Sequence, residues 1–410
     1  MKRLTAYYGG IAIGELEQTS SGRLRFTYTP QWLKHEYARP ISQSLPLQET
    51  ALEERYCIGF FGGLLPEEYN REIIAKNLGI TSKNDFAMLN EIGGECAGAI
   101  TLLPPDSNRT PDEHRYQSIS IAELESILDQ LPQKPLMAGM KDVRLSLAGA
   151  QDKLSLYKDK DGFSIPLNES PSSHIIKPES TRFPGLVENE AYCLSLAQQV
   201  NLPSAKASME QIGKHRCLIV TRYDRNKNDD QLQRLHQEDF CQAMGVPTRI
   251  KYQSEGGPDI VACFQLLRSA SSQPARDLIT LFEAAIFNYL IGNNDAHGKN
   301  FSLLYSPLND SYATRLAPLY DLVSTSYYEE LSPKMAMKIG GKYIPADLRL
   351  EHWEAWWASI EFSKKQARKQ TLTFLDRVEA ALNTPDNEIQ HAIQKIISHR
   401  INRLQKLLKA

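Results

Sequence analysis

The chain has 410 residues, of which 41% are hydrophobic and 23% charged, and its formal net charge is -2 at pH 7. This composition is typical of a globular protein with a substantial core, and the small net charge excludes a global attraction to nucleic acid or membrane surfaces. At roughly 100–200 residues per domain, the length predicts two or three domains.

The first hundred residues are rich in strand signals. LTAYYGGIAIGELEQ and LRFTYTPQWL alternate apolar and polar residues around glycine turns, and CAGAITLLPP is a strand ended by proline. Between them, PEEYNREIIAKNLGI predicts a helix, with proline at its start and glycine at its end. The polar, proline-bearing segment Pro104–Arg115 predicts a domain boundary.

The next segment mixes strands with one helix, and the remainder is mostly helical. RLSLAGAQDKLSLYKD, FSIPL, SHIIKPE and HRCLIVTRYDR are strand-like, and ENEAYCLSLAQQVNL has helical spacing. After about Arg225, helices are predicted at QEDFCQAM, GPDIVACFQLLRSAS, ARDLITLFEAAIFNYLIG, LEHWEAWWASIEFS and the last forty residues. A strand-rich part followed by a helical part is consistent with two lobes.

The cysteines and the N-terminus indicate the compartment. The six cysteines form no CxxC pair and match no zinc spacing, so we expect reduced, buried thiols. The start lacks the apolar core of a signal peptide, and no run approaches the roughly 20 apolar residues of a membrane span. We therefore expect a cytoplasmic protein with no membrane partner.

The segment NNDAHGKN lies between two apolar runs and places Asp295 five positions before Asn300. Protein kinases use an Asp-x-x-x-x-Asn loop, in which the aspartate accepts the proton of the substrate hydroxyl and the asparagine binds Mg²⁺. Because this spacing is common, a polar turn between a helix and a strand is the alternative interpretation.

Asp321 lies downstream, inside the apolar run LAPLYDLVST. A carboxylate in such a run is costly to bury unless it meets a partner such as a metal ion. A kinase needs a second aspartate after the catalytic loop to hold Mg²⁺. A helix N-cap or a buried salt bridge is the alternative.

Lys177 ends the apolar run SHIIKPE. Kinases place a strand lysine on the nucleotide phosphates and pair it with a helix glutamate, for which Glu190 is the candidate. The alternatives are a solvated lysine at a strand end and, for Glu190, a favourable charge in a first helical turn.

The segment SLAGAQDKLSLY, from Ser146 to Tyr157, has small residues between strand-like runs. It predicts a β-turn-β loop whose backbone approaches phosphates, although it is neither a Walker A motif nor a GxGxxG loop. A tight hairpin is the alternative. The order of loop, lysine, glutamate, Asp-x-x-x-x-Asn and aspartate is that of a kinase.

Together with RYDR, QEDFCQAMG and KYQSEGGPDI, these segments resemble the HipA family of bacterial toxin kinases over residues 145–325. FFGGLLPE and IGGECAGAITLLPP resemble the N-terminal subdomain of that family. The resemblance implies an α+β, two-lobed protein-kinase-like fold. We expect a strand-rich N-terminal subdomain over residues 1–105, a mixed N-lobe over 116–225 and a mostly α-helical C-lobe over 226–410.

The resemblance implies a serine/threonine protein kinase that uses ATP and Mg²⁺. Asp295 would be the catalytic base, Asn300 and Asp321 would hold Mg²⁺, and Lys177 would bind the ATP phosphates. Ser146 falls at the serine whose autophosphorylation inactivates the enzyme in this family. The other implied nucleotide contacts are the loop Ala148, Gly149, Ala150, Gln151, Asp152 and Lys153, the hinge Thr221, Arg222 and Tyr223, and also His297, Lys299 and Tyr320, with His297 beside the phosphates.

The implied partners are a protein substrate such as an aminoacyl-tRNA synthetase and a helix-turn-helix antitoxin of the HipB type, through which DNA is contacted only indirectly. Thr221 occupies the hinge position at which the resemblance leads us to expect glutamate. Because the hinge contacts adenine largely through its backbone, this difference is compatible with ATP binding. The segment from Lys177 to Glu190 is shorter than in the best-known member of the family, where this region helps to engage the protein substrate. The alternatives are a small-molecule kinase and an inactive corepressor of an antitoxin.

Overall fold

The computed structural model describes residues 2–105, 107, 114–228, 231–308 and 311–409, and they fall into two compact units. Unit 1 comprises Met1–Pro178, Glu210–Arg249 and Leu304–Ala313, and unit 2 comprises Glu179–Met209, Ile250–Leu303 and Thr314–Ala410. The expected division into residues 1–105, 116–225 and 226–410 stays a prediction. Of the expected linker, residues 106 and 108–113 lie outside the described residues.

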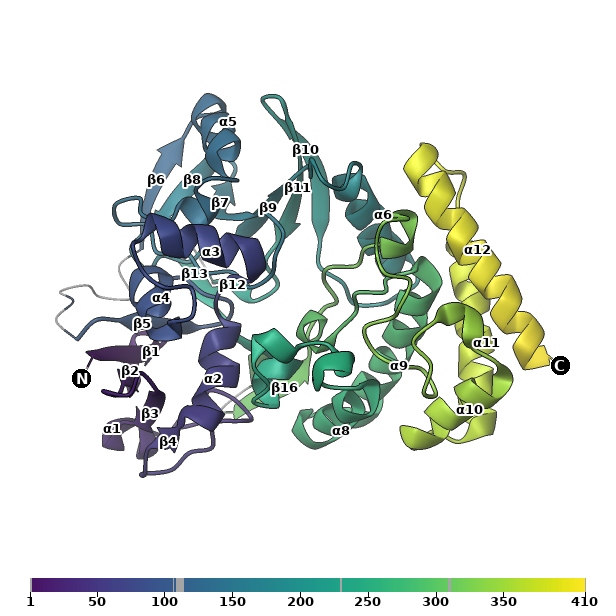
Figure 1. The fold of residues 1–410 in the computed structure, drawn as a ribbon, viewed down its shortest axis with the longest axis horizontal. Coiled ribbons are helices and arrows are strands. Elements are labelled where there is room, and N and C mark those ends of the chain that lie inside the picture. Colours follow the sequence, from purple (N-terminus) through teal and green to yellow (C-terminus); the bar gives the residue numbers. More distant parts are fainter. Residues whose placement is uncertain (1, 106, 108–113, 229–230, 309–310, 410) are drawn as a thin grey trace. The chain divides into compact units, whose positions relative to one another are not determined.

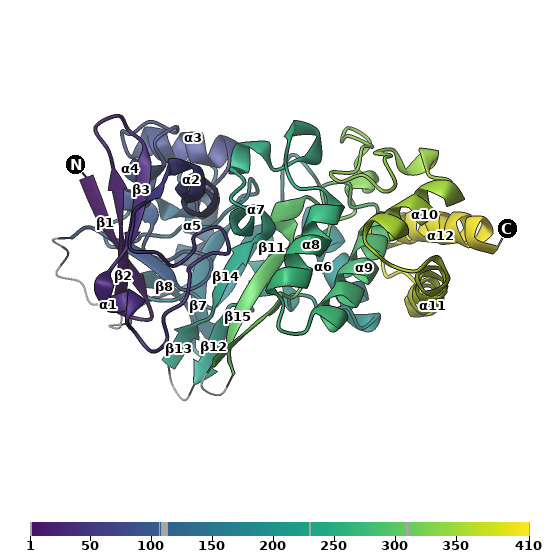
Figure 2. The ribbon, with the colours of Figure 1, turned by 90° about the horizontal axis from the view of Figure 1, so that it is seen from below.

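A five-stranded antiparallel sheet and the helices that follow its strands form the first part of unit 1 (Figure 2). The strand order is β4-β3-β2-β1-β5. The strands expected near the N-terminus and at CAGAITLLPP are present. The elements are β1 (Lys2–Tyr8), β2 (Ile11–Gln18), β3 (Leu24–Tyr28), α1 (Pro30–Leu33), β4 (Leu52–Glu53), α2 (Glu54–Gly63), α3 (Glu68–Asn77), α4 (Asp85–Ile92) and β5 (Ile100–Leu103).

A six-stranded sheet of order β10-β11-β9-β7-β8-β6 forms the second part of unit 1, except that the first residues of β10 are assigned to unit 2. Apolar side chains from both sheets and from α2 belong to one core cluster, which includes Phe26, Phe60, Leu156 and Ile219. The elements are β6 (Arg115–Ile119), α5 (Ile121–Gln130), a 3-10 turn (Pro135–Met137), β7 (Leu154–Asp159), β8 (Gly162–Leu167), β9 (His174–Pro178), β10 (Ala207–Ile212) and β11 (His215–Thr221).

The sequence did not predict two small sheets, although the polar-turn interpretation implied a strand after Asn300. They are formed by β12 (Arg225–Asn228) with β13 (Gln231–Arg234), and by β14 (His236–Asp239), β15 (Ser302–Leu308) and β16 (Ser311–Leu316). The helix expected at QEDFCQAM is therefore confirmed only over Phe240–Ala243, and the residues before Phe240 form a strand instead. The Asp239 side chain caps a single helical turn, α7 (Phe240–Ala243), so the residues before it remain a strand.

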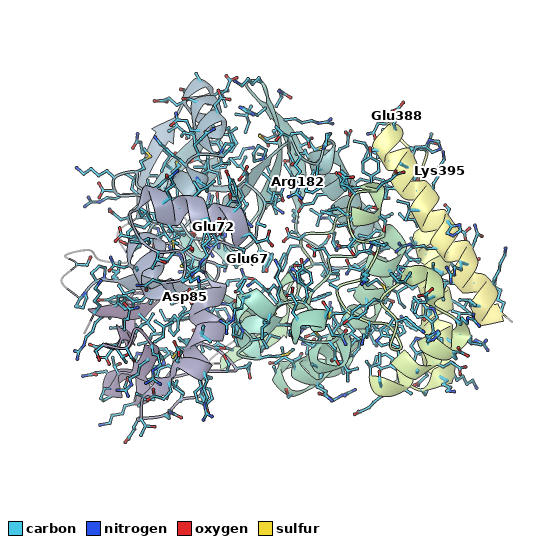
Figure 3. All side chains as sticks on the ribbon, in the orientation of Figure 1. Glu67, Glu72, Asp85, Arg182, Glu388 and Lys395 are labelled. Atoms are coloured by element: carbon cyan, nitrogen blue, oxygen red, sulfur yellow. The ribbon has the colours of Figure 1, made fainter. Side chains whose placement is uncertain are left out.

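Unit 2 is helical, as the sequence predicted, and α9 packs against α8 and α12 (Figure 1). Trp353 and Trp356 are buried, and Phe282 stacks on Trp356 with ring centroids 5.2 Å apart. Glu388 and Lys395 of α12 are exposed (Figure 3). The helices are α6 (Leu186–Gln199), α8 (Ile260–Ala270), α9 (Pro274–Ile291), α10 (Leu350–Ser359), α11 (Lys364–Ala381) and α12 (Glu388–Lys409).

All six cysteines are buried and free, as expected, and burial raises the pKa of the Cys96 thiol to about 12. In the described part of the chain, no helix combines the length and apolarity that crossing a bilayer requires.

Candidate active site

The predicted catalytic loop starts where α9 ends. Gly292 terminates the helix in the left-handed conformation with φ of 76°, and a side chain there would collide with Ser326. The polar residues that follow are thus turned out of the helix, and they run through a 3-10 turn (Gly298–Asn300) into β15.

Asp295 is exposed, whereas its neighbours in the loop are mostly buried. Its backbone carbonyl accepts a hydrogen bond from the His297 backbone N–H at 2.8 Å and another from the Asn300 Nδ2 at 3.2 Å. The Tyr252 hydroxyl donates to Asp295 Oδ1 at 2.8 Å. The loop therefore presents one carboxylate to solvent from a backbone that its own side chains hold in place.

Asn293 links this loop to the segment of Asp321, a role that the sequence analysis missed. Its Oδ1 accepts from the Asp295 backbone N–H at 3.2 Å, and its Nδ2 donates to the Asp321 carbonyl at 3.2 Å. Asn293 is 5% exposed. The available signal was the asparagine pair that directly follows the glycine at the helix end.

Asp321 is only partly buried and has a φ of 50°, which is unfavourable for a residue other than glycine. The N-cap of the next helical turn is Ser324, so the N-cap alternative for Asp321 is wrong. Tyr320, its neighbour, donates from its hydroxyl to the Lys299 carbonyl at 2.6 Å. The segment before Asp321 is thus tied to the predicted catalytic loop.

Helix α6 contacts the chain just beyond Asp321. Asn189 exchanges two hydrogen bonds with the Ser324 backbone, of 2.7 and 3.1 Å. Glu190 is 2% exposed and lies beyond the first turn, which holds Glu188, so the first-turn alternative for Glu190 is wrong. Its pairing with Lys177 stays a prediction.

In unit 1, the segment Ala148–Lys153 is a loop that leads into β7. Gly149 has a φ of 102°, which favours glycine, and the Lys153 ammonium donates to the Ala148 carbonyl. At the start of α3, the Glu67 backbone N–H donates to the Gly149 carbonyl at 3.4 Å and the Asn70 Nδ2 to the Ala150 carbonyl at 3.0 Å. Burial raises the pKa of the Asp152 carboxyl in this loop.

Ser146 precedes this loop and is fully buried, with 0% exposure. Its hydroxyl donates to the Leu64 carbonyl at 2.7 Å and its backbone N–H to the Glu95 carbonyl at 2.8 Å. The flank of the loop that contains Ser146 forms only isolated bridges, Val143 with Asn168 and Leu145 with Glu95, rather than a strand. Since β7 pairs with β8 and β9, the hairpin alternative is wrong, as is the strand before the loop.

Lys177 lies in β9, between β11 and β7, with Leu218 as its partner in the register. It is 6% exposed, so the alternative of a solvated lysine is wrong. A lysine this buried needs compensating polar partners, which fits a specific role better than a surface charge.

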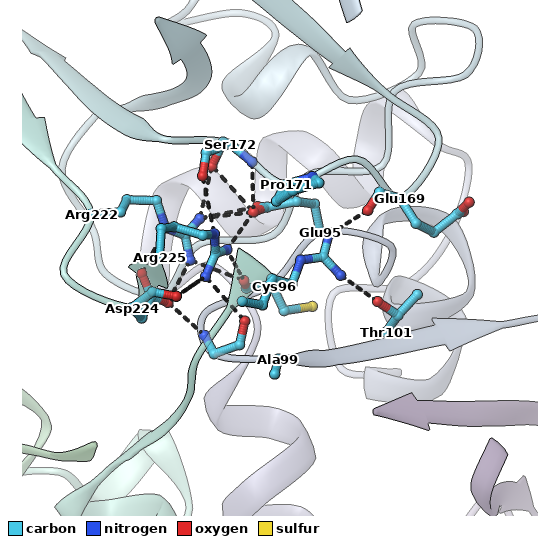
Figure 4. A network of polar contacts seen from close by, with 12 residues as sticks. Glu95, Cys96, Ala99, Thr101, Glu169, Pro171, Ser172, Arg222, Asp224 and Arg225 are labelled. Carbon is cyan, nitrogen blue, oxygen red and sulfur yellow. Dashed lines mark hydrogen bonds and ion pairs between the residues drawn. The ribbon is translucent and has the colours of Figure 1, made fainter. Parts of the chain in front are cut away.

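The predicted hinge is anchored by a buried ionic network (Figure 4). The Arg222 guanidinium donates to Glu95 Oε1 at 3.1 Å and to Asp224 Oδ2 at 2.8 Å, and Arg225 also pairs with both carboxylates. The Ser172 hydroxyl donates to Glu95 Oε1 at 3.2 Å. Thr221 is exposed and Tyr223, half-buried, donates from its hydroxyl to Gln237.

The two carboxylates of this network stay ionised despite complete burial. Burial alone would raise the pKa of Glu95, but Arg222 and Arg225 outweigh it and hold that pKa below its usual range. The same balance lowers the pKa of Asp224. A fully paired network of this kind fixes the backbone on either side of Arg222 and beside Ser146.

Comparison with known proteins shows the family of the chain. Residues 4–103 match the HipA N-terminal domain and residues 145–385 the HipA-like C-terminal domain. The putative kinase Y4mE of Sinorhizobium fredii is 42% identical over 92% of this chain and 90% of its own. The serine/threonine-protein kinase toxin HipA of Shewanella oneidensis is 30% identical over 83% of this chain and 79% of its own.

A solved structure from Shewanella oneidensis, the complex of HipA, HipB and operator DNA, contains a chain that superposes with a TM-score of 0.85. The identity is 25%, and the match covers 99% of this chain and 98% of that one. The fold and these relatives define a serine/threonine protein kinase with the expected two-lobed α+β fold. The chain belongs to the HipA family of toxin kinases.

Proposed function

We propose that this protein is the kinase toxin of a toxin–antitoxin pair and that Asp295 is its catalytic base. The observation that carries the proposal is the loop from Asp295 to Asn300, which exposes one carboxylate on a hydrogen-bonded turn. A serine or threonine hydroxyl of a protein substrate would transfer its proton to this carboxylate as its oxygen attacks the γ-phosphate of ATP.

The residues present fit Mg²⁺ and the nucleotide. The Asn300 Nδ2 donates to the Asp295 carbonyl, so its side-chain oxygen would be the group that binds the metal, and Asp321 would supply a carboxylate. Both are the hard oxygen ligands that Mg²⁺ prefers, and the ion would neutralise charge on the phosphates. In unit 1, the buried Lys177 and the backbone of Ala148–Lys153 would bind the phosphates, and the backbone of Thr221–Tyr223 would meet the adenine. In unit 2, His297, Lys299 and Tyr320 are the further proposed nucleotide contacts.

We assign the protein a translation component as its substrate, such as an aminoacyl-tRNA synthetase, and Ser146 as the site of self-inactivation. A helix-turn-helix antitoxin of the HipB type is the proposed partner, and DNA is contacted through it. The superposition on one chain of the HipA–HipB–operator DNA complex supports the antitoxin as partner. The six buried, reduced thiols fit action in the cytoplasm.

A growth experiment tests the toxin role. Induced expression of the wild-type chain should arrest growth, and co-expression of a helix-turn-helix protein encoded beside it should relieve the arrest. Asp295→Ala should abolish the arrest, whereas Asp386→Ala, which changes an exposed aspartate of the same unit, should not. Arrest by Asp295→Ala as strong as that by wild type would overturn the proposal in favour of a non-catalytic toxin.

A further inference from the structure

The hydroxyl of Tyr252 donates a hydrogen bond to Asp295 Oδ1 at 2.8 Å, across 43 positions of sequence. A tyrosine hydroxyl keeps its proton at neutral pH, so Tyr252 is the donor and the carboxylate the acceptor. A carboxylate has two oxygens that accept independently. A donor fixed on Oδ1 therefore sets the direction of Oδ2. Because Asp295 is exposed, Oδ2 can face an incoming substrate.

The segment KYQSEGGPDI holds Tyr252 rigidly. The backbone N–H groups of Glu255 and Gly257 both donate to the Tyr252 carbonyl at 2.9 Å, closing a tight turn. Gly256 has a φ of 98°, and a side chain at Gly257 would collide with the backbone of Ile250. The turn therefore requires both glycines, and it fixes the backbone from which the tyrosine extends.

The aromatic ring is held as well. It meets the imidazole of His297 edge to face, with centroids 5.2 Å apart and an interplanar angle of 76°. The ammonium of Lys251 lies 5.4 Å from the ring centroid. Because His297 follows Asp295 by two residues, the ring and the hydroxyl of Tyr252 contact the same loop at two points.

We propose that Tyr252 is a positioning residue for the catalytic base. Its hydroxyl keeps the Asp295 side chain in one rotamer, so that the second carboxylate oxygen meets the acceptor hydroxyl and takes its proton while Tyr252 keeps its own. This inference rests on the proposed role of Asp295. It gives the KYQSEGGPDI segment a function in phosphate transfer that does not involve contact with the nucleotide.

The test is a double-mutant cycle of Tyr252→Phe and Asp295→Asn. Phenylalanine retains the ring contact with His297 and removes only the hydroxyl. The maximal rate of self-phosphorylation is measured by intact mass at saturating Mg-ATP, with the slow hydrolysis of Mg-ATP followed in parallel. Tyr343→Phe, a half-buried tyrosine of unit 2 outside the site, is the matched control, and thermal melting checks that each variant is folded.

Tyr252→Phe should lower the maximal rate about tenfold, as expected for a hydrogen bond to a charged group, with KM for ATP unchanged within about twofold. In the Asp295→Asn background, the same change should cost nothing further. A wild-type rate in Tyr252→Phe, or a second tenfold loss in the double variant, would overturn the inference alone. A wild-type rate in Asp295→Asn, or no ATP consumption by the wild type, would overturn the proposed function and this inference with it.

Discussion

The side-chain amide of Asn293 joins the two segments that carry the predicted metal ligands, because it donates to the carbonyl of Asp321 while accepting from the backbone N–H of Asp295. One buried side chain thus fixes the spacing between the base and the second aspartate. Phosphoryl transfer depends chiefly on such positioning and on charge stabilisation.

Replacement of Asn293 should therefore impair catalysis more than folding. We expect Asn293→Ala to lower kcat about tenfold or more, because misplacement of a reacting group by ~1 Å can cost ~100-fold. The apparent affinity for Mg²⁺ should fall as well, which a Mg²⁺ titration of the initial rate measures. Asn383→Ala, at an exposed asparagine of the same unit, is the control. An unchanged Mg²⁺ dependence in Asn293→Ala would contradict this account.

A negative charge at Ser146 should displace the loop that follows it. The site is completely enclosed, and an unpaired carboxylate is far too costly to bury there. Ser146→Asp should raise the Kd for Mg-ATP at least tenfold in calorimetric titration, whereas Ser146→Ala should leave it within about twofold. Limited proteolysis should cut Ser146→Asp within Ala148–Lys153. Equal ATP affinity in the two variants would argue against a regulatory role for this serine.

The buried network around the hinge predicts a large loss of stability when one charge is removed. Glu95→Gln leaves two guanidinium groups with one compensating carboxylate, and breaking a buried ion pair costs about 3–5 kcal/mol. Urea unfolding monitored by tryptophan fluorescence and circular dichroism measures the change. The control, Glu91→Gln, alters an exposed glutamate and should shift stability by less than about 0.5 kcal/mol. If Glu95→Gln also lowered the free energy of unfolding by less than about 0.5 kcal/mol, the network would not be needed for stability.

The buried carboxyl of Glu238 should make folding stability depend on pH in the opposite sense to the carboxyl of Glu95. Burial raises its pKa from 4.5 to about 7, although the hydrogen bond from the Tyr305 hydroxyl opposes the shift. Between about pH 4.5 and 7 the folded chain holds a proton that the unfolded chain has lost, so this group makes stability fall as pH rises. Glu238→Gln removes the effect.

The difference in unfolding free energy between Glu238→Gln and wild type should therefore grow in favour of the variant by about 3 kcal/mol from pH 4.5 to 7.5. Denaturant unfolding at several pH values measures it. Parallel curves for the two proteins would show that Glu238 titrates normally.

The elements that could be predicted from the sequence are those that depend on a local pattern of neighbouring residues. The periodicity of α9, its glycine stop and the polar segment Asp295–Asn300 are local, so the helix and the turn that follows it could be predicted. The strands β12, β13, β14 and β16 were missed because their residues lack strong alternation and pair only in the folded chain.

Relationships between distant segments could not be predicted. In the sequence, Lys177 resembles a solvated lysine at a strand end; only the folded sheet shows that its strand lies between β7 and β11. Likewise, Glu95 and Arg222 are 127 positions apart, and the sequence around either residue contains no pattern that predicts their ion pair. The buried network, the environment of Ser146 and the Tyr252 contact all arise from such long-range packing.

Intact-mass spectrometry after incubation with Mg-ATP decides whether Asp295 is the catalytic base of a Mg-ATP-dependent serine/threonine kinase. The wild type and the Asp386→Asn control should each gain a phosphate, which maps to Ser146. Asp295→Asn should acquire it at least ~100-fold more slowly. Phosphate incorporation by Asp295→Asn at the wild-type rate would show that Asp295 is not the base.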